Sequence, residues 1–233
     1  MWVVRNSKIR KIIFIWLAIG HFSANAQQNN PLYDLQKIHF GFSIIGDHAS
    51  YKLNPSQDFW LDNQVLNIEQ MDYAGFGFGG LMNARISDHF DFRTALNLHF
   101  TQRDLVFTFS DQSKRQIEME NTYFEVPMLI KLKSIRHRNV RIYVIGGVNY
   151  RYDFASDIDT DRSFEKPIVA LSPNTYSYDL GLGFDLYFEF FKFSPEIKLS
   201  SALNSYLARD KYIFSQSIGS LMPRLVQISF SFE

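Results

Sequence analysis

The sequence contains a glycine pattern that binds dinucleotides in another setting. Gly75, Gly77 and Gly80 have the spacing G-x-G-x-x-G, which lets a helix N-terminus approach a pyrophosphate when the motif follows a strand and opens a helix. Here the glycines lie inside an alternating segment with Phe76 and Phe78 on the other face. We therefore expect them to make room for large side chains in a narrow interior.

An acidic stretch has the opening spacing of a calcium-binding loop. Asp157, Asp159 and Asp161 are placed at alternate positions. An EF-hand also requires Gly at its sixth position and Glu at its twelfth, where this sequence has Arg162 and Ile168. We interpret the stretch as a solvated acidic loop and predict no metal site.

No residues are visibly paired for nucleophilic catalysis. The motifs G-x-S-x-G and H-E-x-x-H do not occur, and the chain has no cysteine, which excludes thiolate chemistry and disulfide bonds. His48, beside Asp47, is the only histidine expected near a long outer loop, whereas His39 and His99 have inward parity, where hydrogen-bonded packing is expected. We predict a protein that is not an enzyme, with no cofactor and no small-molecule substrate.

Strict alternation of apolar and polar residues indicates which elements position these side chains. In residues 90–101 the even positions are Phe, Leu or Thr while the odd positions are mostly polar, and residues 175–188 alternate in the same way. A period of two is a strand pattern and excludes an amphipathic helix. Alternation over about ten residues is typical of strands that span a membrane.

Eight such segments follow one another along the chain. They cover residues 38–47, 72–86, 90–101 with an extension to 109, 119–133, 140–154, 175–188, 192–201 and 224–233. Within the third, the apolar residues change from even to odd positions between Phe100 and Phe109, which predicts a β-bulge near Gln102 and Arg103.

The connections between these segments alternate in length. The short ones are 87–89, 134–139 and 189–191, and the long, polar ones are 47–71, 110–118, 155–174 and 202–223. This order predicts an all-β fold, an eight-stranded antiparallel transmembrane β-barrel of the outer-membrane type. Such barrels have short periplasmic turns, long extracellular loops and, with an even strand number, both termini in the periplasm.

Charged residues have the parity that faces the barrel interior. Eight strands leave a lumen that side chains can fill, so we predict a structural network of paired charges there rather than an ion or proton path. Its members are Arg93, Glu125, Lys131, Arg141, Glu196 and Lys198. A soluble lipocalin is the alternative fold, but it would turn its apolar face inward around a ligand.

The start of the chain reads as an export signal. Arg5, Lys8, Arg10 and Lys11 precede an apolar run, and Ala24-Asn25-Ala26 follows it, so residues 1–26 are predicted to be a signal peptide, 27–37 a periplasmic tail and 38–233 the barrel domain. Removing the signal leaves 20 basic against 24 acidic residues, a formal charge of −4, with no nucleic-acid footprint. Aromatic residues make up 16% of the chain, which suits lipid-facing and interfacial girdles.

Several stretches resemble a known family. Residues 123–131, YFEVPMLIK, followed by 141–147, RIYVIGG, are similar to the small outer-membrane barrels of Bacteroidota. Residues 181–198, GLGFDLYFEFFKFSPEIK, and 224–230, RLVQISF, resemble the PorT branch of those barrels. The resemblance covers the mature chain and implies a role in the type IX secretion system, which exports proteins with a C-terminal signal domain and serves gliding motility in some species. It implies no catalytic residues.

Three functions compete at this point. The first is a non-catalytic accessory or assembly component of type IX secretion, with outer-membrane lipid and other secretion-machine proteins as partners, because a narrow filled barrel cannot pass folded cargo. The second is a surface adhesin or ligand-binding barrel that works through its extracellular loops. The third is a membrane-embedded hydrolase or acyltransferase.

Overall fold

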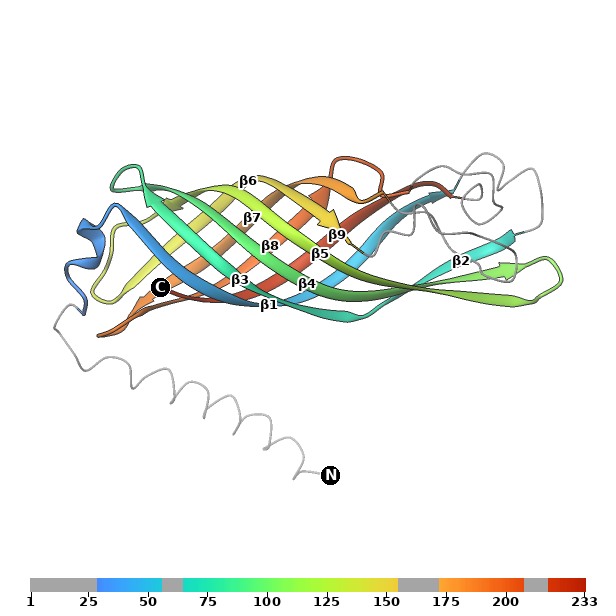
Figure 1. The fold of residues 1–233 in the computed structure, drawn as a ribbon, viewed down its shortest axis with the longest axis horizontal. Coiled ribbons are helices and arrows are strands. Elements are labelled where there is room, and N and C mark those ends of the chain that lie inside the picture. The colour runs from blue at the N-terminus through green and yellow to red at the C-terminus, as the bar shows by residue number, and fades with distance from the viewer. Residues whose placement is uncertain (1–28, 56–64, 155–171, 208–217) are drawn as a thin grey trace, which may run out of the picture.

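The computed structural model describes residues 29–55, 65–154, 172–207 and 218–233 (Figure 1). The predicted signal peptide and the acidic stretch at 157–161 lie outside the described residues. A 3-10 helix, Tyr33–Leu35, precedes the strands. The strands are β1 (Ile38–Pro55), β2 (Val65–Asp72), β3 (Ala74–Arg85), β4 (Phe90–Phe109), β5 (Lys114–Lys133), β6 (Val140–Asp153), β7 (Asn174–Tyr187), β8 (Lys192–Ala202) and β9 (Ile218–Phe232).

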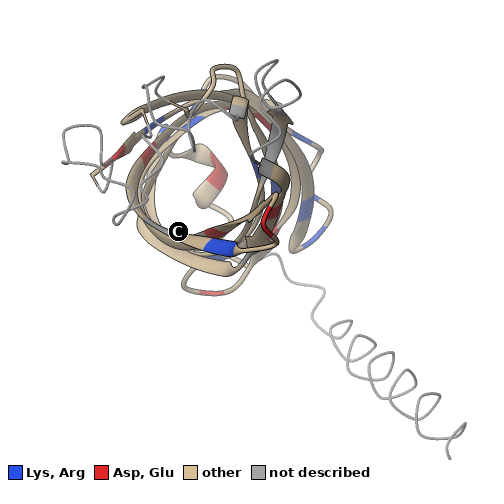
Figure 2. Ribbon diagram, turned by 90° about the vertical axis from the view of Figure 1, so that its right-hand side faces the viewer, with Lys and Arg blue, Asp and Glu red and all other residues tan. Residues whose placement is uncertain are grey.

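The strands form one closed antiparallel barrel. β2 and β3 both pair with β4, so they act as a single strand of the wall that is interrupted at Tyr73. The wall has the strand order β4-β3-β1-β9-β8-β7-β6-β5, and the pairing of β4 with β5 closes it. Figure 2 shows the resulting ring of strands. The predicted eight-stranded barrel is thus confirmed.

The two faces of the wall differ as a membrane barrel requires. Leu182 is 50% exposed on the outside, whereas the neighbouring inward residue Asp185 is 1% exposed. A soluble lipocalin would show the opposite arrangement. The apolar band is therefore the lipid-facing surface, and the polar side chains fill the lumen.

One end of the barrel carries the short turns, the segment 29–37 and Glu233; we call it the turn end. The opposite end, where β1, β4, β5 and β9 extend farthest, is the loop end (Figure 1). Among the described residues no helix is both long and apolar enough to cross a membrane.

The strands are longer at the loop end than the alternation predicts. β1 continues to Pro55 rather than ending at Asp47, and β5 begins at Lys114 rather than Met119. The predicted connections 47–71 and 110–118 are therefore too long. Their polar residues interrupt the hydrophobic pattern, but backbone pairing with β9 and β4 continues because a ladder outside the lipid needs no apolar face.

The predicted bulge at Gln102 and Arg103 is misplaced. The β4–β5 register runs from Asn97 through Thr108 without a shift. The irregularity lies in the neighbouring strand, since Phe76 pairs with Phe100 but Asp72 pairs with Arg103, which leaves one extra residue around Tyr73. Beyond this point burial in β4 no longer alternates, since Asp104, Leu105, Val106 and Phe107 are all buried.

Candidate functional site

The charged side chains that alternate along the strands gather in the lumen. All six residues of the predicted network face inward, and none is more than 9% exposed. They do not form one network, however. Glu125 and Lys198 pair with each other nearer the loop end, whereas Arg93 pairs with Glu196 nearer the turn end. Lys131 and Arg141 pair with acidic residues outside the predicted set.

The loop-end network is centred on Glu125, which is fully buried. Its carboxylate accepts hydrogen bonds from Lys198 Nζ at 2.7 Å, Arg151 Nε at 3.1 Å and Gln227 Nε2 at 3.2 Å. Lys198 also lies 3.1 Å from Asp179. Because each charge has a partner and further hydrogen bonds, the cost of burying these ions is offset within the cluster.

An imidazole on the neighbouring strand β4 completes this network. His99 Nδ1 lies 2.6 Å from Asp47 Oδ2, and its Nε2 lies 3.7 Å from Glu125. Tyr123 stacks on the ring with centroids 4.9 Å apart. A Cβ on Gly77 would lie 2.6 Å from His99 Nδ1, so this glycine leaves the space that the imidazole occupies. Asp–His pairing can orient a catalytic base, but in the described lumen no hydroxyl is hydrogen-bonded to Nε2.

The turn-end network surrounds Tyr143, a fully buried inward side chain of β6. Its hydroxyl donates to Glu196 at 2.9 Å, and Glu196 also accepts from Arg93 Nη1 at 2.7 Å. Lys131 Nζ lies 3.7 Å from the centre of the Tyr143 ring and donates to both oxygens of Asp185 at 2.8 Å. The cation–π contact and the ion pair therefore hold the Lys131 ammonium group in place.

The segment 29–37 covers the turn end. The Tyr33 hydroxyl donates to Glu233 at 3.0 Å, and its ring stacks on His39 with centroids 3.8 Å apart. Lys192 lies 2.9 Å from Glu233 and 4.7 Å from the centre of the Tyr33 ring. Burial and the nearby Glu233 carboxylate raise the pKa of the Tyr33 phenol, so it stays protonated and remains a hydrogen-bond donor.

Asp34 anchors this segment to the wall. Its carboxylate lies 2.9 Å from Arg141 Nη1 and 3.4 Å from Arg136 Nη1. Burial acts to raise the pKa of Asp34, but Arg141 and Arg136 outweigh it and the pKa lies below its ordinary value. Arg85 also donates to the Asp34 backbone carbonyl. The predicted tail residues 29–37 are thus packed on the barrel mouth.

A small cavity lies between the two networks, lined by apolar side chains and also by Arg93, Glu196, Lys198 and Gln227. Ile45, Leu81 and Leu129 are each at most 5% exposed and line this cavity of about 40 Å³. Asn97 Oδ1 and Gln227 Oε1, from residues that also line it, have no hydrogen-bond partner within the described protein. Such a space holds roughly three waters, which would satisfy these atoms. The cavity is too small for a solute path through the lumen.

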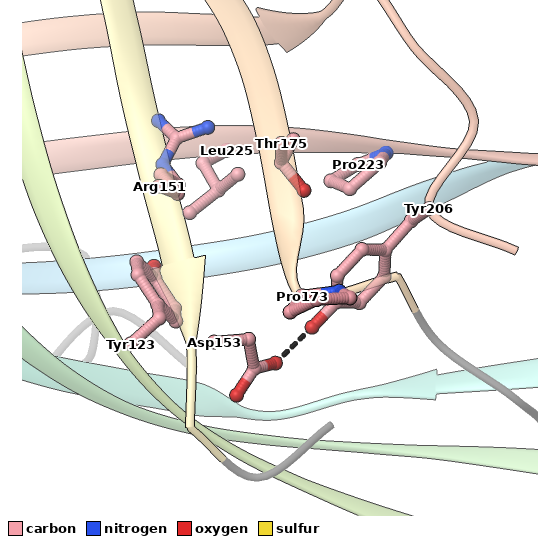
Figure 3. A pocket seen from close by; sticks show the side chains of 8 residues that line it. All are labelled: Tyr123, Arg151, Asp153, Pro173, Thr175, Tyr206, Pro223 and Leu225. Atoms are coloured by element: carbon pink, nitrogen blue, oxygen red, sulfur yellow. Dashed lines mark hydrogen bonds between the residues drawn. The ribbon is translucent and has the colours of Figure 1, made fainter. Parts of the chain in front are cut away.

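At the loop end a second cavity, of about 20 Å³, lies beside Tyr206 (Figure 3). The Tyr206 hydroxyl donates to Asp153, and Asn121 Nδ2 lies 2.6 Å from the same carboxylate oxygen. Figure 3 shows Tyr206 pointing from its loop toward Asp153 at the end of β6. These hydrogen bonds attach the residues after β8 to the loop-end mouth of the barrel, which narrows the opening.

Sequence reasoning missed several members of the two networks. Glu233 continues the inward parity of Gln227, Ser229 and Ser231, so extending the alternation by one position would have found it. Asp185 and Asp179 likewise share the inward face of β7. Nothing in the pattern points to Asp34, because it lies in a segment without periodicity. No group of His, Asp or Glu in the described residues is arranged to hold a metal ion.

Comparison with known protein families identifies this architecture. The family model described as outer membrane protein beta-barrel domain matches residues 25–208. The chain belongs to this family. The outer membrane beta-barrel domain of this chain gave no match among curated proteins. An outer membrane location follows from the family and the fold.

Solved structures similar to this outer membrane barrel share little sequence identity with it. The outer membrane protein OprG from Pseudomonas aeruginosa is 15% identical, with a TM-score of 0.45 over 84% of this chain and 93% of that one. The N-terminal β-barrel domain of Pseudomonas aeruginosa OprF is 10% identical, with a TM-score of 0.35 over 88% and 99%. Neisserial surface protein A is 10% identical, with a TM-score of 0.41 over 84% and 98%.

Proposed function

We propose that this protein is a non-catalytic, non-conducting barrel that serves as an accessory or assembly component of the type IX secretion system. The observation that carries the non-conducting part is the filled lumen. Two ion-paired networks and inward apolar side chains occupy it, and Tyr33 covers the turn end. A barrel that transports nothing through its centre acts through its surfaces.

The secretion role itself is supported by the PorT-like stretches of the sequence. In this proposal the turn end faces the periplasm and the loop end faces the outside, as the short turns and long connections favour. The partners are outer-membrane lipid and other secretion-machine proteins that contact the wall, the loop end or the segment 29–37.

The test is a strain in which the gene is deleted. Proteins with the C-terminal secretion signal are expected to stay uncleaved inside the cell, while porins and lipoproteins still reach the outer membrane. Complementation with a variant lacking residues 29–34 tests the turn end, and one with a shortened 155–174 connection tests the loop end. Normal secretion in the deletion strain would refute the proposal.

A surface adhesin is the second candidate, and the extended strands favour it. β4 ends at Phe109 and β5 begins at Lys114, and together they form a hairpin that projects beyond the barrel (Figure 1). A projecting ladder offers a surface for contact outside the membrane. Loss of adhesion with unchanged secretion in the deletion strain would select this function.

A further inference from the structure

A groove of about 430 Å³ lies on the outer face of the barrel wall toward the loop end. It crosses β1, β9, β8 and β7, whose register aligns its residues in two transverse rows. The row nearer the loop end is Ser50, Arg224, Ser201 and Tyr178, and the next row is His48, Val226, Leu199 and Leu180. The first row is polar, and the second is apolar except at His48.

Small residues make the wall concave here. Ser50 and Ser201 flank Arg224 in the polar row. One position farther along the outward face of β1 is Gly46, where an added Cβ would meet nothing closer than the Ile228 carbonyl oxygen at 3.9 Å. Large neighbours therefore surround a space that the wall itself does not fill.

Arg224 is an exposed cation on a face otherwise made for lipid. Among the described residues it has no hydrogen-bond or ion-pair partner. A charge on the lipid face costs about 2–4 kcal/mol at the bilayer midplane and about 0–1 near the interface. Together with the exposed Tyr178 and Tyr176, which have the character of an interfacial aromatic belt, this marks the polar row as the level of the lipid headgroups.

Below that level the groove is lined for acyl chains. Val226, Leu199 and Leu180 are 38%, 57% and 59% exposed. The following row across the same strands continues with exposed Ile228, Ile197 and Leu182. An anionic headgroup over Arg224 and hydrocarbon over these rows would match the groove in both charge and polarity.

We propose that this groove binds a phosphorylated glycolipid of the outer leaflet, with a phosphate on Arg224 and acyl chains along the apolar rows. The guanidinium offers a planar fork of donors that suits phosphate, and the hydroxyls of Ser50, Ser201 and Tyr178 lie in the same row to supply further donors. The assignment to the outer leaflet rests on the barrel orientation proposed above.

The test uses the detergent-extracted barrel, native mass spectrometry and bisphosphorylated lipid A as the probe. Arg224→Gln is expected to weaken binding about five- to tenfold, since a basic residue near a membrane surface contributes on the order of 1 kcal/mol. Arg224→Lys should retain part of the binding, since the charge stays but the planar fork of donors is lost. Ser201→Phe should abolish it with the charge unchanged, because the ring fills the groove.

Lys114→Gln is the matched control, because it removes one exposed positive charge at the same end of the barrel but outside the groove. Heat-modifiable migration on a gel verifies that each variant is folded. Equal binding by Arg224→Gln and the unchanged protein, or equal losses for Arg224→Gln and Lys114→Gln, would overturn the proposal. So would equal binding of dephosphorylated lipid A, or of phosphatidylglycerol as the alternative phosphate source.

The orientation is tested separately with an epitope inserted in the turn at residues 110–113. Labelling on intact cells supports the outer-leaflet assignment. Failure to label until the outer membrane is permeabilised would overturn that assignment and the proposed orientation, whereas the secretion role is judged independently by the deletion strain.

Discussion

Replacing Glu125 by Gln should destabilise the barrel by about 3 kcal/mol. The carboxylate is fully buried and accepts from Lys198 and Arg151, and breaking a buried ion pair by removing one partner costs roughly 3–5 kcal/mol. The lower end of this energy range applies because Lys198 still has Asp179 as an ion-pair partner at 3.1 Å. Arg151 likewise keeps hydrogen bonds to two serine hydroxyls.

Urea titration of the folded barrel in lipid vesicles measures this loss, with heat-modifiable gel migration as the readout of folded protein. Glu189→Gln provides the control, because Glu189 is exposed in the turn between β7 and β8 and surface changes of this kind stay within about 0.5 kcal/mol. A Glu125→Gln barrel within about 1 kcal/mol of the unchanged protein would refute the view that the ion pairs stabilise the lumen. A double variant with Lys198→Met should lose more stability than Glu125→Gln alone, because Asp179 then loses its lysine partner at 3.1 Å.

Three further changes test other parts of the structure. Leu182→Arg, on the lipid face, should cost about 2–4 kcal/mol in the same urea titration if the residue lies near the midplane; a neutral effect would mean that the faces are reversed. Gly183→Leu should lower the folded yield, because even its Cβ would lie 2.5 Å from the Tyr143 side chain and 2.8 Å from the Pro195 backbone carbonyl oxygen, and Tyr143→Ala should remove only the first of these contacts. Because the pKa of Asp34 is lowered in the folded state, its pairing with Arg141 stabilises the packed segment above the ordinary aspartate pKa of about 4 and is lost as the pH falls through the lower folded value. Limited proteolysis at the start of the chain should therefore increase in acid, and Asp34→Asn should remove the increase.

Alternation alone predicts the barrel and the direction of each side chain, because strand geometry turns every second residue to one face. Arg93, Glu125 and Lys198 are inward for this reason, and their burial follows from parity without knowledge of their neighbours. The ion-pair partners of these residues cannot be predicted from parity. They depend on the register between strands and on the tilt of the barrel, which bring Arg93 near Glu196 from 103 positions away.

The division into two networks could not be predicted either. Ile45, Leu81 and Leu129 lie on three different strands, yet they meet around the cavity between the two networks. Their proximity is a property of the register and is invisible along any single strand. The role of Asp34 was equally hidden, since a segment without alternation gives no sign of which surface it contacts.

The contacts of segment 29–37 at the turn end also form in a definite order during folding. Tyr33 lies 200 positions from Glu233, its hydrogen-bond partner, and Lys192, beneath its ring, comes from β8. The partners of Tyr33 are therefore supplied by the last strands to be made, whereas Arg141 and Arg136, the partners of Asp34, come earlier in the chain. Because contacts of such sequence separation form late in folding, Tyr33 can reach Glu233 only after β9 has been added to the wall. This contact then marks the completed wall, and an unfinished barrel stays open at this end for whatever factors handle its strands during insertion.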